Sequence, residues 1–467
     1  MAVLITEAQP NHYKAPVDLT KFAITRNAFL PEKSMPKILS NPYYAPWELI
    51  IQHLPEHIRN GTVRDVIAQL PVLSTRHLKS EAEWRRAYVM LAYLTSAHTW
   101  GGDQPEEILP PQITIPFLEI ADHVEMPPGV SYTATNLWNF TSTNEDDFSN
   151  IDDLDVIVSF TGTKDEVWFL MISVAMEAQA AGILQIVMNA IDAIRIHNYP
   201  VITNALRELH TCIQNVSRLL GRMGEGCDPL VFYHQIRPFL AGSKNMEHAG
   251  LPRGLFYDEG DGRGEWRQLR GGSNGQSSLI QFFDIALGVE HYSHGSVGKK
   301  SYHDEVREYM PGPHRRFLEY ISRLGSIREA VLNSPTTEEE LRAAYVAATD
   351  ALSSFRDRHI QIVTRYIILP SKQAPRQNAR KNLASASAEK NGSQELTGTG
   401  GTTLVPFLKQ ARDETAEAGQ IRGEVASLFE DAQNAVFKLM ASDSVPKFLR
   451  SPKYEQQLRN YEFDVVG

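Results

Sequence analysis

The chain has 467 residues, of which 42% are hydrophobic and 22% charged, and this composition excludes wholesale disorder. Its 46 basic and 56 acidic residues give a net charge of −10, which argues against a protein that binds nucleic-acid backbones or an anionic membrane surface. Two cysteines, Cys212 and Cys227, are too few for a disulfide framework, a four-cysteine zinc site, a cysteine-ligated cluster or a covalently attached c-type haem.

The N-terminal third, residues 1–150, is predicted to form a small α-domain. Its first residues carry no basic segment and only a short apolar run, which is not typical of a secretory signal peptide, so we expect a cytoplasmic protein. The segment 142–155, STNEDDFSNIDDLD, is acidic and polar. We predict that it links the small domain to the larger remainder of the chain.

The most apolar stretch, residues 167–191, is long enough to raise the question of a membrane span. A helix that is apolar on nearly all sides within a soluble protein is a buried central helix. We favour that interpretation, because four polar residues interrupt the stretch: Glu177, Gln179, Gln185 and Asn189.

Further helices are predicted where apolar residues recur with helical spacing. Ser277 and Ser278 are good N-cap residues for one of them, and Thr336 with Glu339 has the spacing of a capping box for the last. The three segments are residues 206–222, 277–291 and 336–368.

Alternating strand patterns are scarce, so the fold is predicted to be all-α, with a large helical domain at residues 151–410. Within it, residues 371–401 are rich in Lys, Asn, Ala, Ser, Gly and Gln and have little to bury, which predicts a mobile loop. Residues 411–467 regain helical pattern, most visibly at 424–441, and are predicted to form a C-terminal helical extension.

One of the 15 histidines, His359, lies on the apolar face of the last predicted helix. Such an imidazole points into the core, where it is more often a hydrogen-bonded core residue than a ligand. The alternative is an axial ligand to a buried b-type haem. No second histidine or carboxylate stands three or four positions away, which argues against a zinc or di-iron site. The face is formed by Tyr345, Ala348, Leu352, Phe355, Ile362 and Tyr366.

Arg237 stands in the apolar context LVFYHQIRPFLAG, where its charge needs a partner. An internal salt bridge and a clamp for a substrate carboxylate are equally consistent with this context. The glycine-rich segment 271–278 opens a predicted helix, so its free N–H groups could meet an anion, but it lacks the Gly-Lys-Ser/Thr of a phosphate-binding loop.

Seven separated stretches, in this order, resemble the indoleamine 2,3-dioxygenase family and together cover about residues 46–409. Matches in a fixed order are far more specific than any single one, and the chain is identified as a fungal-type member. The stretches are AHTWGG from Ala97, LPPQITIPF from Leu109, LDVIVSF from Leu154, GGSNGQSSLIQFFD from Gly271, YMPGPHRRFLEYI from Tyr309, RDRHIQIVTRYIILP from Arg356 and GTGGTTLVPFLK from Gly398.

The resemblance implies an enzyme with one noncovalent haem b that adds O₂ across the indole 2,3-bond of L-tryptophan. The product would be N-formylkynurenine, in the first step of the kynurenine pathway, which feeds NAD synthesis. His359 is implied as the proximal ligand of the haem iron, and Arg356 with Asp284 as a polar network on the propionate side. No residue is implied as a general acid or base.

The resemblance also implies nine substrate-binding positions. Arg237 would hold the substrate carboxylate, and Thr399 lies in the loop that would close over the site. The others are Phe232 beside the arginine, Phe169 and Ser173 above the haem, Tyr132 and Thr135 on the small-domain wall of the indole pocket, and Gly272 and Ser273 in the loop near the substrate. Of the residues above the haem, only Ser173 is expected to be polar.

Four residues depart from the family pattern and are expected on the pocket walls, where they would change affinity and substrate range. Leu170 replaces a common aromatic, Thr135 the cysteine of animal enzymes and Asn274 a small alanine, and Pro238 also differs from the animal pattern. The rival hypotheses are a haem or oxygen carrier without turnover and a haem-free interaction protein. Expected partners are tryptophan and O₂, with no nucleic acid and no membrane, and the chain is expected to be a monomer.

Overall fold

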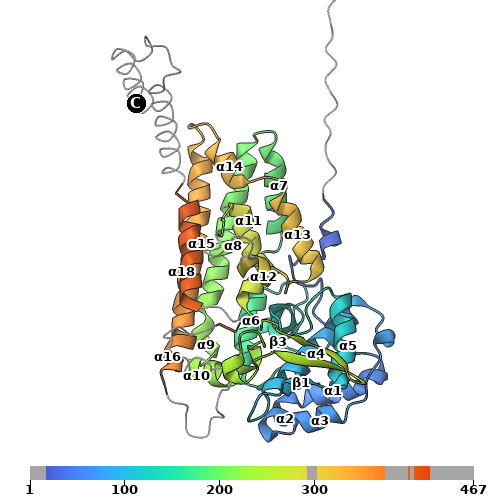
Figure 1. The fold of residues 1–467 in the computed structure, drawn as a ribbon. Coiled ribbons are helices and arrows are strands. Elements are labelled where there is room, and N and C mark those ends of the chain that lie inside the picture. Colours follow the sequence, from blue (N-terminus) through green and yellow to red (C-terminus); the bar gives the residue numbers. More distant parts are fainter. Residues whose placement is uncertain (1–16, 292–301, 374–397, 400–403, 421–467) are drawn as a thin grey trace, which may run out of the picture.

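The computed structural model describes residues 17–291, 302–373, 398–399 and 404–420 (Figure 1). Helices dominate and the strands are few and short, so the prediction of a mainly helical fold is confirmed. Short helices near the N-terminus gather at one end of the molecule, beside a bundle of longer helices (Figure 1). The predicted helix at 424–441 lies outside the described residues.

The small domain is built around one buried helix, α4 (Glu81–Trp100). A capping box starts it, because Ser80 and Glu83 each accept a hydrogen bond from the other residue's backbone N–H. Arg86 of α4 donates to the Glu48 carboxylate at 2.7 Å, a buried ion pair that ties α4 to α1. The helices around it are α1 (Ala45–Gln52), α2 (Leu54–Asn60), α3 (Val63–Ala68) and α5 (Pro111–His123).

Two small sheets join the small domain to the rest. β1 (Ile108–Leu109) pairs in parallel with β4 (Leu255–Gly260), which pairs with β5 (Arg263–Arg267). β2 (Phe140–Ser142) pairs antiparallel with β3 (Leu154–Val156), so the ends of the predicted linker 142–155 form a hairpin. Phe148 and Ile151 within it are buried. The acidic segment is therefore anchored by two apolar side chains, and its role as a link between the domains stays a prediction.

The apolar stretch 167–191 forms two helices and not one, α6 (Lys164–Ala178) and α7 (Ile183–Ile194). Gly182 breaks the stretch, since it adopts a left-handed conformation with φ of 77°. Residues 164–194 contain the one segment among the described residues that is long and apolar enough to cross a membrane, and 67% of its most apolar window is buried. Ten residues of α6 are buried, namely Glu166 and residues 170–178, so the predicted core position is confirmed for this helix.

The large domain is organised around α15 (Glu339–Val363), which packs along α8 (Tyr199–Gly221) and α18 (Leu404–Ala418) (Figure 1). The predicted capping box at Thr336 is wrong: α15 begins at Glu339, after Glu338, whose side chain makes no capping hydrogen bond. A π-helical segment, η10 (Thr364–Ile368), continues α15. The predicted boundary at residue 410 falls inside α18.

Shorter elements complete the large domain. Ser277 caps α11 as predicted, since its side chain accepts from the N–H of Ile280. The further helices of this domain are α9 (Met223–Gly226), α10 (Pro229–Val231), α11 (Ser278–Leu287), α12 (Tyr302–Arg307), α13 (Gly312–Ser322), α14 (Ile327–Leu332), α16 (Leu369–Ser371) and the π-helical segment η6 (Phe232–Ile236). Another π-helical segment, η4 (Thr133–Leu137), belongs to the small domain.

Candidate functional site

A single cavity between the two domains brings together all the residues that the sequence assigned to the site. Its walls come from η4 of the small domain and from α6, η6, α11, α12, α15, η10 and α18 of the large domain. The predicted residues that line it are Tyr132, Thr135, Phe169, Ser173, Phe232, Arg237, Gly272, Ser273, Asp284, Arg356, His359 and Thr399.

His359 of α15 lines this cavity next to apolar side chains. Burial lowers the pKa of its imidazole to about 4, with a contribution from the positive charge of Arg356. The ring is therefore neutral at pH 7, which is the form that binds metals. No hydrogen bond of this ring is present in the described part of the chain, so a hydrogen-bonded core histidine is the weaker of the two interpretations. Its role as a haem ligand stays a prediction.

Helix α6 supplies another wall through Phe169, Ser173 and Glu177, which share one helical face. Its first turn is fixed by Glu166, whose carboxylate accepts hydrogen bonds from the backbone N–H groups of Phe160 and Thr161. The ring of Phe169 lies 4.7 Å from that of Phe232, centroid to centroid. The aromatic pair thus joins α6 to η6 at the cavity.

All three π-helical segments of the described chain contribute to the cavity. Thr135 comes from η4, Phe232 from η6, and Tyr366 from η10. A π-turn inserts an extra residue into a helix and is frequent at functional sites. The three insertions change the direction in which these side chains point, and sequence periodicity does not reveal them.

Arg237 opens a 3₁₀ turn, Arg237–Leu240, directly after η6. It is buried, lines the cavity, and has its guanidinium carbon 5.6 Å from the centre of the Tyr233 ring. Burial lowers the pKa of this arginine, which the nearby Tyr233 partly opposes, but a guanidinium stays charged at pH 7. A buried cation on the wall of an apolar cavity is suited to pair with a carboxylate.

The glycine-rich segment closes the cavity through close backbone packing. A Cβ on Gly271 would lie 2.1 Å from the carbonyl oxygen of Leu240, so only glycine fits there. The next residue, Gly272, donates its N–H to the same carbonyl at 3.0 Å. The Thr399 hydroxyl donates to the Gly272 carbonyl at 2.7 Å. These contacts bring two distant, glycine-rich segments together at the cavity.

Asp284 of α11 and Arg356 of α15 form a buried ion pair, with Nη2 of the arginine 2.6 Å from Oδ1 of the aspartate. Burial alone would raise the pKa of Asp284, but Arg356 and the hydrogen bond with His291 outweigh it and bring the pKa to about 2. Arg356 also donates to the Ala411 carbonyl at 2.7 Å and to the Thr415 hydroxyl. The predicted polar network therefore exists and holds α11, α15 and α18 together.

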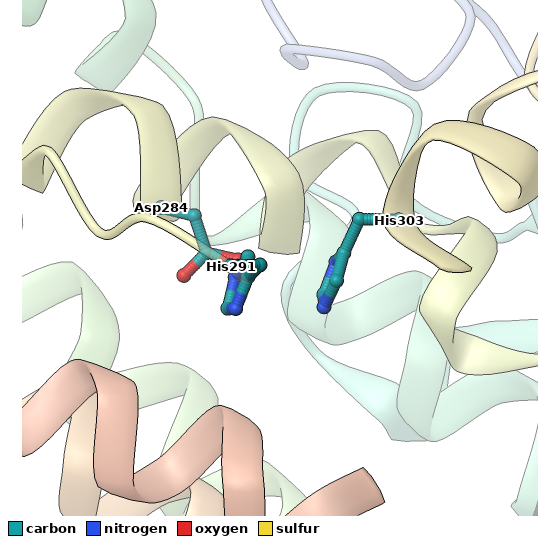
Figure 2. A group of neighbouring side chains, drawn as sticks. All are labelled: Asp284, His291 and His303. Carbon is teal, nitrogen blue, oxygen red and sulfur yellow. The ribbon is translucent and has the colours of Figure 1, made fainter. Parts of the chain in front are cut away.

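Two histidines that the sequence did not assign to the site extend this network. Figure 2 shows the rings of His291 and His303 side by side, with Asp284 next to His291. The two rings are parallel within 5°, with centroids 3.7 Å apart. His291 has Nε2 3.1 Å from Oδ2 of Asp284 and Nδ1 2.6 Å from the Glu414 carboxylate. His303 belongs to α12 and lines the cavity.

Glu177 is another residue of the cavity wall that the sequence did not assign to the site, and its carboxyl is buried. Oε1 accepts hydrogen bonds from the Tyr132 hydroxyl at 3.0 Å and the Ser277 hydroxyl at 2.5 Å. Oε2 has no hydrogen-bond partner among the described residues. Burial raises the pKa of Glu177 to about 7, although both hydroxyls oppose the shift. The expectation that Ser173 is the only polar group on this wall is therefore wrong.

The four departures from the family pattern differ in where they lie. Thr135 and Asn274 line the cavity, whereas Leu170 and Pro238 do not. Leu170 is a residue of α6 and is buried in the core. The expectation that all four alter the pocket wall is wrong for Leu170 and Pro238. Leu170 lies on a face of α6 that does not line the cavity, and Pro238 lies in the 3₁₀ turn Arg237–Leu240, where it does not line the cavity either.

Comparison with protein-family models gives two matches. The model described as indoleamine 2,3-dioxygenase matches residues 18–418, which is most of the chain and includes every residue of the cavity. A model of the regulator of G protein signaling domain matches residues 401–457. That second match is short, shares residues 401–418 with the first, and otherwise falls largely outside the described residues.

Curated relatives are similar over most of their length. The indoleamine 2,3-dioxygenase nanC of Aspergillus nanangensis is 38% identical over 86% of this chain and 97% of its own length. The indoleamine 2,3-dioxygenase of Saccharomyces cerevisiae is 38% identical over 87% and 94%. The 6-hydroxytryptophan 2,3-dioxygenase fscD of Fusarium equiseti is 35% identical over 84% and 95%.

Proposed function

Since the chain belongs to the indoleamine 2,3-dioxygenase family and is a dioxygenase, we propose that its substrate is L-tryptophan and its product N-formylkynurenine. The observation that carries this proposal is one cavity that contains a neutral imidazole, His359, and a buried guanidinium, Arg237. The first suits a haem iron and the second an amino-acid carboxylate.

The residues around His359 fit a haem b. The imidazole is neutral, has no competing hydrogen bond among the described residues, and is flanked by apolar side chains of α15 and α18, which suit a porphyrin face. Arg356 adds a positive charge one turn before His359. When bound, the haem would supply the activation of O₂.

The protein's own residues then bind and orient the substrate. Arg237 would hold the carboxylate, and the Phe169–Phe232 pair would pack against the indole ring and exclude water. Thr399 also lines the cavity, and its hydroxyl donates a hydrogen bond to the Gly272 carbonyl. The insertion of O₂ needs no general base from the protein, so orientation and exclusion of water are the main tasks of this cavity.

Two variants test the assignments separately. His359→Ala should lose the haem, which the absorbance spectrum of the purified protein reports, while His53→Gln, an exposed histidine, should retain it. A native haem spectrum in His359→Ala would refute the ligand.

Arg237→Ala should keep the haem and lose kcat/KM for tryptophan on the order of 100-fold, because a buried charge-assisted contact to the carboxylate is removed. Arg237→Lys keeps the charge and should lose less. Normal turnover by Arg237→Ala would rule out the carboxylate clamp, and a haem-loaded wild type without any turnover would favour an oxygen carrier.

The substrate range needs its own measurement, since one relative is named for 6-hydroxytryptophan. Thr135, Ser173 and Glu177 give the cavity polar groups that could accept a ring hydroxyl. We therefore propose that the enzyme tolerates ring-hydroxylated tryptophan, with L-tryptophan preferred. The ratio of kcat/KM values for the two substrates tests the preference.

The cellular setting follows as a further proposal. Both cysteines are buried and unpaired, which suits a reducing compartment such as the cytoplasm. There the product would enter kynurenine formation and NAD synthesis. That the chain acts as a monomer stays a prediction, which light scattering coupled to size exclusion checks.

A further inference from the structure

Asp284, His291 and His303 form a cluster beside the cavity that the reaction described above does not use as a unit. Each offers one ligand atom, and these atoms all lie within 4.8 Å of one another. The carboxylate comes from α11, one imidazole follows that helix, and the other comes from α12 (Figure 2). All three side chains are buried or half-buried.

We propose that this cluster binds a divalent transition-metal ion, with zinc the best match, as a site separate from the iron ligand His359. Two imidazoles and one carboxylate are a ligand set that zinc commonly takes. Oδ2 of Asp284 lies 3.1 Å from Nε2 of His291. Two ligands of one tetrahedral zinc, each about 2.1 Å from the metal, stand about 3.4 Å apart, so this pair is already close to the required separation. The His303 ring is parallel to that of His291 within 5°, so it would have to rotate out of this stack to direct its nitrogen at the same ion.

The groups behind the ligands have the arrangement expected around a metal. A histidine that binds a metal usually donates its other ring N–H to a carboxylate, which fixes the ring. Nδ1 of His291 has this contact with Glu414, at 2.6 Å. Arg356 holds Oδ1 of Asp284 at 2.6 Å and leaves Oδ2 directed toward the histidines.

His303 distinguishes a metal site from a simple ion-pair network. A protonated His291 between two carboxylates would explain the contacts of Asp284, His291 and Glu414 without a metal. It would not explain His303, whose Nε2 is buried and has no hydrogen-bond partner among the described residues. A buried nitrogen left without a partner is costly, and a metal ion would satisfy it.

The position of the ion would matter for the enzyme. It would link α11 with α12 and, through Glu414, with α18, and all three helices supply side chains to the cavity. A structural ion at this point would stabilise the part of the cavity wall that these three helices form. Its role would be structural, because its ligands include neither Arg237, which would hold the carboxylate of tryptophan, nor His359, which would bind the haem iron.

The test is zinc binding to the full chain loaded with haem, stripped of other metals and titrated with ZnCl₂ in a calorimeter, with zinc content checked by mass spectrometry. We expect one zinc per chain with a Kd in the micromolar range or tighter. His303→Leu and His291→Gln should each abolish or weaken binding at least tenfold, and Glu414→Gln should weaken it roughly 10- to 100-fold. His53→Gln, in the small domain, is the matched control and should bind as the wild type does.

His303→Leu leaves the ion pairs of Asp284 and His291 intact, so we expect it to fold, which circular dichroism checks. His359→Ala should still bind zinc, which separates this site from the haem ligand. Stoichiometric zinc absent from the wild type, or zinc binding unchanged in a folded His303→Leu, would overturn the proposal.

Discussion

Asp284 and Glu177 are both buried carboxyl groups on the wall of one cavity, but their surroundings differ. Asp284 faces the guanidinium of Arg356 and the imidazole of His291, and its pKa is about 2. Glu177 receives only two hydroxyl donors, Tyr132 and Ser277, and burial raises its pKa to about 7. The two groups show that the partners decide the charge of a buried carboxyl, and burial alone does not.

This difference assigns the two groups different tasks. The charge of Asp284 is permanent near neutral pH and holds α11, α15 and α18 together through Arg356. The charge of Glu177 changes near pH 7, on the same helix as Phe169 and Ser173. The chain thus places a fixed ion pair and a titrating group on the wall of one cavity.

The largest effect is expected from removing the fixed charge. Asp284→Ala leaves Arg356 as a buried cation without its carboxylate, which should cost about 3–5 kcal/mol in the free energy of unfolding. Urea denaturation at pH 7 measures this, with exposed Asp192→Ala as the control. The pKa of Asp284 is lowered, so in the wild type this contribution is present above about pH 4 and is lost as the pH falls toward 2. A loss below 1 kcal/mol would show that the pair is not what holds these helices.

A smaller effect on the free energy of unfolding, with the opposite pH dependence, is expected from replacing Glu177. Its pKa in the folded protein, about 7, is above the ordinary value of 4.5, so the folded chain keeps a proton that the unfolded chain has lost. Wild-type stability should therefore fall as the pH rises from about 4.5 to 7 and level off above that. Glu177→Gln, which carries no charge, should be more stable than the wild type at pH 8, by up to about 3 kcal/mol, and gain little at pH 5. Stability curves that run parallel for the two proteins would contradict the raised pKa.

The smallest effect on stability is expected from removing one of the two hydrogen-bond donors to the Glu177 carboxyl. Tyr132→Phe removes a single hydrogen bond to Glu177 and should cost about 1 kcal/mol. Because this hydroxyl opposes the upward shift, its removal should also raise the pKa of Glu177 further. The midpoint of the pH dependence of unfolding reports the change. A downward shift would mean that the hydroxyl does not donate to the carboxylate.

The helices that rest on strong periodicity were predictable from the sequence, and their ends were not. The stretch 206–222 lies almost entirely within α8, and α11 covers residues 278–287 of the stretch 277–291. The stretch 167–191 looked continuous because its composition is uniformly apolar, yet one left-handed glycine, Gly182, divides it. The hairpin at 142–155 escaped prediction because strands as short as β2 and β3 carry too few residues to show alternation.

The residues of the site also divide into those that the sequence could predict and those that it could not. His359 and Arg237 could be predicted as site residues because the family resemblance covers them, and in the structure both line the same cavity. Glu177 was visible on the helical face of Ser173, but its raised pKa depends on neighbours from distant segments. His291 and His303 were missed because their contact joins two segments that have no common pattern.

The most direct test of the proposed function is product formation under labelled oxygen. The purified, haem-loaded and reduced protein is supplied with L-tryptophan and ¹⁸O₂, and the product is analysed by mass spectrometry. The account predicts N-formylkynurenine that carries two ¹⁸O atoms, with Arg237→Ala forming far less of it. Haem-loaded protein that binds O₂ but forms no product, or a product with a single labelled oxygen, would contradict it.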